Sequence, residues 1–227
     1  PPAAQVQQRL SDWLEQRDAS DHLRGQVRDF WDNGGAERIE RDRLDGIVQV
    51  IGLVDDRARP LMEACRAGAT PETLATADWL NGEQLTPLVR DHLRMLLARS
   101  LVQGAYYDEA LVQLEPLTPE NILDPAALLF YRGVVYHHLA DKEKGIAVLD
   151  RLLENQQQLP QRYRVLGRLM REDLAQLKTG SLDDISRRMK DIRRQLEFGR
   201  VGEHVQQSED EVIKMLDKPV SYTHLRA

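Results

Sequence analysis

Several features that define familiar classes of protein are scarce in this sequence. The single cysteine, Cys65, excludes an internal disulfide. No apolar run approaches the roughly 18 residues of a membrane-spanning helix. Positive charge is not in excess, because the net charge is −6, and this argues against general affinity for nucleic acid or acidic lipid. Sustained alternation of apolar and polar residues, the signal of β-strands, is nearly absent. What remains is the composition of a globular protein, with 41% hydrophobic and 30% charged residues.

Common catalytic and cofactor motifs are also missing. The sequence has no phosphate-binding loop, dinucleotide fingerprint, His-Glu-x-x-His, Gly-x-Ser-x-Gly or paired cysteines. His137 and Asp141 have a spacing that suits a metal, but a third ligand is lacking, and adjacent His138 points about 100° away on a helix. Cys65 follows apolar helical residues and is predicted to be a core thiol. No catalytic residue, metal or cofactor is therefore predicted, and the alternative is a helical enzyme with a scattered site.

The starts of helices are clearly indicated. Four dipeptides place a hydroxyl or carboxylate before a proline, which is favoured at the first position of a helix. They are Thr70-Pro71, Thr86-Pro87, Thr118-Pro119 and Asp124-Pro125. The fold class predicted is all-α, with short connections that make successive helices antiparallel neighbours. Helices are expected over 4–17, 21–32, 36–54, 58–67, 71–80 and 87–103. Two hairpins are expected within 87–117 and 125–154, followed by helices over 160–178 and 182–198 and a last helix that runs to 218.

Two stretches of the chain have the same pattern of small and apolar residues at a spacing of 35 residues. Ala98 in the first stretch, for example, corresponds to Gly133 in the second. A repeated helical hairpin cannot bury its apolar face alone, so the spacing predicts stacked helix pairs. The pattern in 87–157 resembles the tetratricopeptide repeat (TPR), in which small residues lie where the two helices approach closely. The matched positions are Ala98, Leu101, Ala110, Leu111, Leu114 and Leu117, then Gly133, Tyr136, Gly145, Ile146, Leu149 and Leu152.

The repeats also depart from the family pattern. Arg132 stands where a leucine is usual, and Pro116 falls inside the second helix of the first unit, which it should end or kink. A third unit, led by Gly167 and Met170, breaks register. The resemblance therefore implies a short, diverged, solenoid-like stack with extra helices at both ends.

The resemblance further implies a partner groove lined by the first helix of each hairpin. Met95, Phe130 and Val134 stand where the family's peptide clamp has lysine and asparagine, so that clamp is not expected. The groove either accepts an apolar helix or extended segment of a partner protein, or is filled by the N-terminal helices. Its expected residues are His92, Met95, Arg99 and Val102, then Ala127, Phe130, Val134 and His137.

The C-terminal region contains the one basic cluster, at 187–194. Arg187, Lys190 and Arg194 share a helical face that either contacts phosphate or an acidic partner, or is a solvated flank paired with nearby acids. The same region has an apolar seam over 185–216, which either packs on the body of the protein or supports self-association. Nucleic acid is not the expected partner, since the protein is acidic and aromatic residues do not interleave with the cluster.

These observations divide the chain into four regions. We expect an N-terminal helical region over 1–84, a TPR-like core over 85–180, amphipathic helices over 181–218, and a tail over 219–227 that resembles a non-native read-through sequence. The start, Pro1-Pro2, looks trimmed and fits an exported, periplasmic protein, while a cytoplasmic location stays open. The function expected is a non-enzymatic interaction or scaffold module for an unidentified protein partner.

Overall fold

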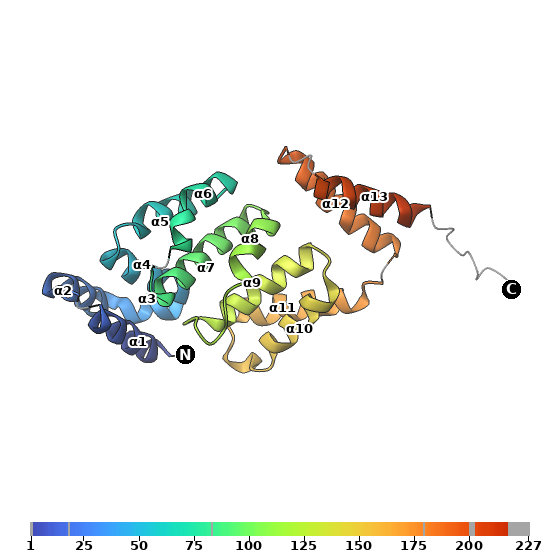
Figure 1. Cartoon of the computed structure of the whole chain (residues 1–227). Coiled ribbons are helices and arrows are strands. Elements are labelled where there is room, and N and C mark those ends of the chain that lie inside the picture. Colours follow the sequence, from blue (N-terminus) through green and yellow to red (C-terminus); the bar gives the residue numbers. More distant parts are fainter. Residues whose placement is uncertain (1, 18, 83, 179, 200–202, 218–227) are drawn as a thin grey trace.

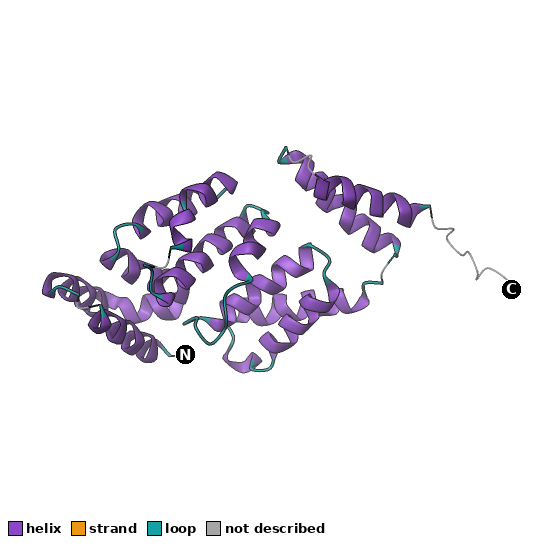
Figure 2. Cartoon of the chain, viewed as in Figure 1, coloured by secondary structure: helices purple, strands orange, loops and turns teal. Residues whose placement is uncertain are grey.

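The computed structural model describes residues 2–17, 19–82, 84–178, 180–199 and 203–217. Within these ranges every regular element is helical and no strand occurs, so the prediction of an all-α fold is confirmed (Figure 2). Nor does any helix of the described chain have the length and apolar character needed to cross a membrane. The predicted read-through tail, 219–227, lies outside the described residues.

The N-terminal region is built from short helices. The prediction of one helix over 36–54 is wrong, because the backbone at Asp42 is extended (φ −144°). The Asp42 carboxylate accepts the backbone N–H of Asp45 at 3.0 Å and so begins a new helix. The predicted helix over 71–80 likewise ends at Thr76 and is followed by a single 3₁₀ turn, Asp78–Asn81. The helices are α1 (Ala3–Gln16), α2 (Asp21–Phe30), α3 (Ala36–Arg41), α4 (Arg43–Val54), α5 (Ala58–Ala67) and α6 (Pro71–Thr76).

The spacing of 35 residues recurs in the backbone of the central hairpins. Ala105 and Ala140, 35 residues apart, both adopt the left-handed conformation, with φ of 62° and 56°. In each turn the next backbone N–H donates to a carbonyl five residues earlier at 2.9 Å, which is the bond of a Schellman cap. The two connections are therefore geometrically equivalent. The helices here are α7 (Pro87–Gln103), α8 (Tyr107–Leu114), α9 (Pro125–His138), α10 (Lys142–Leu153) and α11 (Gln161–Gln176).

The small residues of the repeat lie where helices approach closely. A Cβ on Gly133 would lie 2.4 Å from Cδ2 of Leu149 on α10. A Cβ on Gly145 would lie 2.5 Å from Cδ1 of Leu174 on α11. Both distances are far below van der Waals contact, so glycine lets these helices pack at this separation despite its low helix propensity.

The two departures from the family pattern, Pro116 and Arg132, are structurally linked. Helix α8 ends at Leu114, as a proline two residues later predicts. Nη2 of Arg132 on α9 donates to the carbonyl oxygens of Leu114, Glu115 and Leu117 at 2.7, 3.1 and 2.5 Å. The arginine thus satisfies carbonyls that the shortened helix leaves without helical partners.

The predicted helix starts are only partly correct. Asp124 does cap α9, where its carboxylate accepts the backbone N–H of Ala127 at 3.2 Å. Helices α6 and α7 begin at Pro71 and Pro87, as predicted, but the Thr86 hydroxyl accepts the indole N–H of Trp13 at 3.1 Å and does not cap α7. No helix begins at Thr118-Pro119.

One hydrophobic core extends from Val6 to Leu177. It crosses the predicted boundary at residue 85, because α4 and α5 pack against α7. The N-terminal region and the repeats therefore share a core. The remaining helices, α12 (Leu182–Glu197) and α13 (Glu203–Leu216), form a hairpin at the opposite end of the row of helices from α1 (Figure 1).

Polar and aromatic contacts join this hairpin to the body. Arg194 on α12 donates to the carbonyl of Ala105 at 2.6 Å and to Asp108 at 3.0 Å, so it reaches the turn between α7 and α8. Phe198 stacks on Tyr106 of the same turn, with ring centroids 4.4 Å apart. The C-terminal end of α12 is therefore fixed beside the first repeat unit, far from it in sequence.

Candidate partner groove

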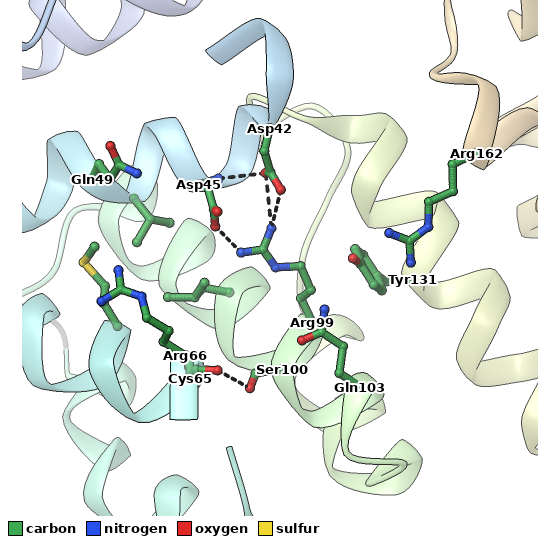
Figure 3. Close-up of a pocket in the computed structure, with 13 residues that line it drawn as sticks. Asp42, Asp45, Gln49, Cys65, Arg66, Arg99, Ser100, Gln103, Tyr131 and Arg162 are labelled. Atoms are coloured by element: carbon green, nitrogen blue, oxygen red, sulfur yellow. Dashed lines mark hydrogen bonds and ion pairs between the residues drawn. The ribbon is translucent and has the colours of Figure 1, made fainter. Parts of the chain in front are cut away.

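A polar pocket of about 330 Å³ lies where the N-terminal helices meet the repeats (Figure 3). It is formed by α4, α5, α7, α9 and α11, so residues distant in sequence converge on it. The capped start of α4 supplies the acids Asp42 and Asp45, and α5, α7 and α11 supply the arginines. Its lining residues include Asp42, Asp45, Cys65, Arg66, Leu96, Arg99, Ser100, Gln103, Tyr131 and Arg162.

Arg99 occupies the centre of this first pocket. Its Nη1 lies 3.1 Å from Oδ2 of Asp42, and its Nη2 forms a second ion pair with Asp45. The guanidinium is only 14% exposed. Burial disfavours its charge, but the ion pairs with Asp45 and Asp42 outweigh this and raise the pKa of Arg99. Asp42, which breaks the predicted helix over 36–54, and Asp45 in the first turn of α4 therefore fix the N-terminal region to α7.

Cys65 and Ser100 form the buried floor of the first pocket. The Ser100 hydroxyl donates to the carbonyl of Cys65 at 2.8 Å and accepts the N–H of Ala69 at 2.9 Å, which fixes the end of α5 against α7. Burial raises the pKa of the Cys65 thiol to about 12, so the thiol is protonated at neutral pH. A buried, protonated thiol fits the prediction of a structural cysteine in a helical core.

A second pocket, of about 710 Å³, lies between α12 and the helices α8, α9 and α11. Two clusters that the sequence analysis treated separately, the adjacent histidines and the basic cluster, meet here. Its lining residues are Tyr107, His137, His138, Leu169, Met170, Asp173, Asp183, Arg187, Lys190, Asp191 and Arg194.

The charged groups of the second pocket, apart from Lys190, are engaged in ion pairs. Oδ2 of Asp173 lies 2.7 Å from Nε2 of His137 and 2.8 Å from Nη1 of Arg187. Arg187 and, to a smaller extent, His137 hold the pKa of Asp173 below its usual value. The ring of His138 stacks on Tyr107 at 4.2 Å, and desolvation, followed by the nearby charge of His137, lowers the pKa of His138. This arrangement connects α9, α11 and α12 through ion pairs and leaves Asp173 without a free oxygen for proton transfer.

One face of α11 connects the two pockets. Arg162 lines the first pocket and Asp173 the second, and Leu166 and Leu169 share their helical face at spacings of three and four residues. These leucines are 39% and 56% exposed, and neighbouring Val165 is 47% exposed. We define the groove as the first pocket, this face of α11 and the second pocket.

The predicted groove residues are displaced by one position on two helices. Met95 and Phe130, predicted to face the groove, are fully buried, whereas their neighbours Leu96 and Tyr131 line the first pocket. One residue corresponds to about 100° of rotation on a helix, which is enough to turn a side chain from the groove into the core. The two positions that line the pocket also obey the repeat, since Leu96 and Tyr131 are 35 residues apart.

The other predicted groove residues divide into three groups. Arg99 lines the first pocket and His137 lines the second, as expected of groove residues. Val102 and Val134 are half-buried against the core and line neither pocket. Ala127 and His92 are buried, so neither offers a surface to a partner.

His92 has a structural role. Its Nε2 accepts the backbone N–H of Leu123 at 3.0 Å, and its Nδ1 lies 2.7 Å from the carbonyl of Leu88. Only the neutral tautomer with hydrogen on Nδ1 satisfies both partners, because a backbone N–H can only donate. Burial lowers the pKa of His92 to about 4, in agreement with this tautomer. The side chain thus fixes the start of α7 to the loop before α9.

Comparison with models of protein families, with curated proteins and with solved structures finds no match for this chain. The groove must therefore be interpreted from its own residues. No group of three or more His, Cys, Asp or Glu side chains within the described ranges is placed to hold a metal ion. What the groove offers is charge, exposed apolar surface and shape.

The predicted basic patch does not act as one free surface. Arg187 pairs with Asp173 and Asp183, and Arg194 pairs with Asp108 and Asp191. Lys190 alone of the three has no acidic partner in the described chain. The sequence left two interpretations open for this cluster, and the one in which a helix flank pairs with nearby acids describes both arginines.

Five residues of the groove were not predicted from the sequence: Arg66, Tyr131, Arg162, Leu166 and Leu169. A signal for the leucines was present, because α11 has more apolar residues than one neighbouring helix can cover. Its buried face contains Gly167 and Leu174, and the exposed leucines lie on a different face. The two arginines had no local signal, since their common pocket depends on how α5 packs relative to α11.

Proposed function

We propose that this chain is a non-enzymatic interaction module that binds a short segment of a partner protein in the groove. The observation that carries the proposal is the pair of exposed leucines, Leu166 and Leu169, which lie between the charged residues of the two pockets. Exposed apolar surface rimmed by polar groups is typical of a binding site for another protein. A segment lying along α11 could cover these leucines and place side chains in both pockets.

The repeat architecture supports this proposal. The equivalent turns at Ala105 and Ala140, and the close approaches at Gly133 and Gly145, are features expected of TPR-like hairpins. In the family that the sequence resembles, the first helices of the hairpins line the ligand groove. Helices α7, α9 and α11 occupy that place here. A TPR-like scaffold is therefore the assignment that we propose for residues 87–176.

The chemistry of the groove favours binding over catalysis. The Cys65 thiol, with its pKa raised to about 12, is a poor nucleophile. Asp173 and His137 form a pair, but no serine, threonine or cysteine lines the second pocket. The pairing of Arg187 and Arg194 with acids similarly weakens the case for phosphate or nucleic acid at the basic cluster, since both charges are already compensated.

The proposal can be tested with a displayed library of random peptides about 12 residues long, enough for roughly three helical turns. Peptides selected on the whole chain are synthesised with a fluorophore, and binding is measured by fluorescence anisotropy. The double variant Leu166→Glu/Leu169→Glu should weaken binding by about 100-fold or more, because burying a leucine contributes roughly 1.5 to 3 kcal/mol.

The matched control is Val112→Glu. Val112 is 66% exposed on α8 and lines neither pocket of the groove. This variant should bind the peptides as the wild type does, and circular dichroism should show the same helicity for all three proteins. The proposal fails if the library yields no binding peptide, or if the leucine variant binds as tightly as the control.

A further inference from the structure

The acids that line the groove have one property in common. Each forms an ion pair with an arginine that lines the same pocket, so three guanidinium groups engage all five carboxylates. The pairs are Asp42 and Asp45 with Arg99, Asp173 and Asp183 with Arg187, and Asp191 with Arg194.

Three cations of the groove remain without such a partner. Arg66 and Arg162 line the first pocket from α5 and α11, and Lys190 lines the second from α12. All three are exposed, and none has an acidic partner in the described part of the chain. The first pocket has three arginines to two aspartates and the second has three cations to three aspartates, so the groove as a whole carries one excess positive charge in a protein whose net charge is −6.

The arrangement along α11 places apolar surface between these charges. Arg162 precedes Leu166 and Leu169 on one helical face, and that face continues to Asp173 in the pocket that also contains Lys190. From Arg162 to Asp173 the helix rises by roughly 16 Å, at 1.5 Å per residue. A ligand along the face thus passes Arg162 and the leucines and then reaches the pocket in which Lys190 of α12 is the cation without an acidic partner.

From this order we infer that the occupant of the groove is an acidic amphipathic peptide segment, with apolar residues at its centre and Asp or Glu toward both ends. The inference rests on the proposed function and specifies its partner. Apolar side chains of the segment cover Leu166 and Leu169, and its carboxylates meet Arg66 and Arg162 at one end and Lys190 at the other. The exposed leucines favour a peptide over a nucleic acid, whose backbone has no comparable apolar surface.

Charge contributes selectivity more than affinity in this arrangement. Each exposed ion pair contributes little, and salt screens it, so the apolar centre supplies most of the binding. Complementary charge instead speeds association and disfavours segments with basic ends. Peptides selected from the random library should accordingly be enriched in Asp and Glu on both sides of Leu, Ile, Val or Phe.

The decisive variant is Arg66→Glu/Arg162→Glu/Lys190→Glu in the whole chain. It should bind the selected peptides about tenfold more weakly or worse, a change of roughly 1.4 kcal/mol or more. Versions of those peptides with Lys in place of each acid should show the reverse preference and bind this variant more tightly than the wild type. The matched control is Arg28→Glu/Arg41→Glu/Lys214→Glu, which makes the same change in net charge at exposed cations outside both pockets.

The outcomes separate this inference from the proposed function. If selected peptides lose binding to the leucine variant but show no acidic enrichment, or bind both charge-reversed proteins equally, the interaction module stands and the acidic partner is wrong. If no peptide is selected, the proposed function fails and the inference fails with it. Binding of single-stranded oligothymidylate to the wild type but not to the groove variant, with no peptide selected, would assign the cations to nucleic acid.

Discussion

Replacing His92 with glutamine should flatten the dependence of stability on pH. The folded protein holds this imidazole neutral, with a pKa of about 4 against an ordinary value of 6.5, because burial disfavours its charge. The unfolded chain binds a proton more readily, so stability is complete above about pH 6.5 and falls as the pH decreases toward 4. One pH unit in this window corresponds to at most about 1.4 kcal/mol.

The expected size of the effect follows from these two pKa values. Between about pH 7 and pH 5 the His92 contribution should fall by about 2 kcal/mol. Urea unfolding followed by circular dichroism at the two pH values measures the difference directly. His92→Gln keeps a donor and an acceptor but cannot titrate, so it should lose about 2 kcal/mol less than the wild type over the same interval.

A second histidine provides the control. His22 is exposed on α2, and His22→Gln removes an imidazole without changing the core. This variant should keep the pH dependence of the wild type. Equal losses of stability in His92→Gln and the wild type would refute the conclusion that His92 is buried in its neutral form between Leu88 and Leu123.

Three further predictions concern packing. Leu114→Asp should unfold the helical stack, because it places an unpaired charge at a fully buried position. Val112→Asp, at a side chain 66% exposed on the same helix, should barely change the melting temperature. A Leu114→Asp variant with wild-type melting would contradict the packing described. Gly133→Ala should lower the free energy of unfolding in urea by about 1 to 2 kcal/mol, since overpacking outweighs the gain in helix propensity, and a more stable variant would disprove the close approach. Arg194→Met should increase hydrogen exchange in α12 and α13 about tenfold or more, because charge-assisted hydrogen bonds contribute roughly 1.5 to 3 kcal/mol. Arg193→Met, at a side chain 74% exposed, should leave the exchange rates unchanged. Equal exchange in the two variants would refute the role of Arg194.

Local chemistry made much of the fold predictable. The cap at Asp124, the end of α8 before Pro116 and the turns at a spacing of 35 residues each depend on a few neighbouring residues. The break at Asp42 was missed although an aspartate can cap a helix, because apolar residues continue at helical spacing on both sides of it. Its role is clear only with Arg99, which is 57 residues away in sequence.

The groove was less predictable, because tertiary packing decides which side of each helix lines it. Met95 and Leu96 are both apolar, as are Phe130 and Tyr131, so the sequence alone could not decide which member of each pair faces the groove. The packing of α4, α5 and α10 decides it. The same holds for Arg194, whose partner Asp108 is 86 residues earlier. Pairings at such distances arise from the stacking of helices and have no counterpart in local spacing.

The contact between Arg132 and the end of α8 has a consequence for the evolution and redesign of this protein. A leucine at position 132 would bring the chain closer to the repeat pattern that it resembles, yet it would leave the carbonyls of Leu114, Glu115 and Leu117 without the donor that now serves them. The reversal is tolerable only together with the replacement of Pro116 by a residue that lets the helix continue. The two positions are therefore epistatic, and a consensus sequence applied to one of them alone would weaken the fold that it was meant to strengthen.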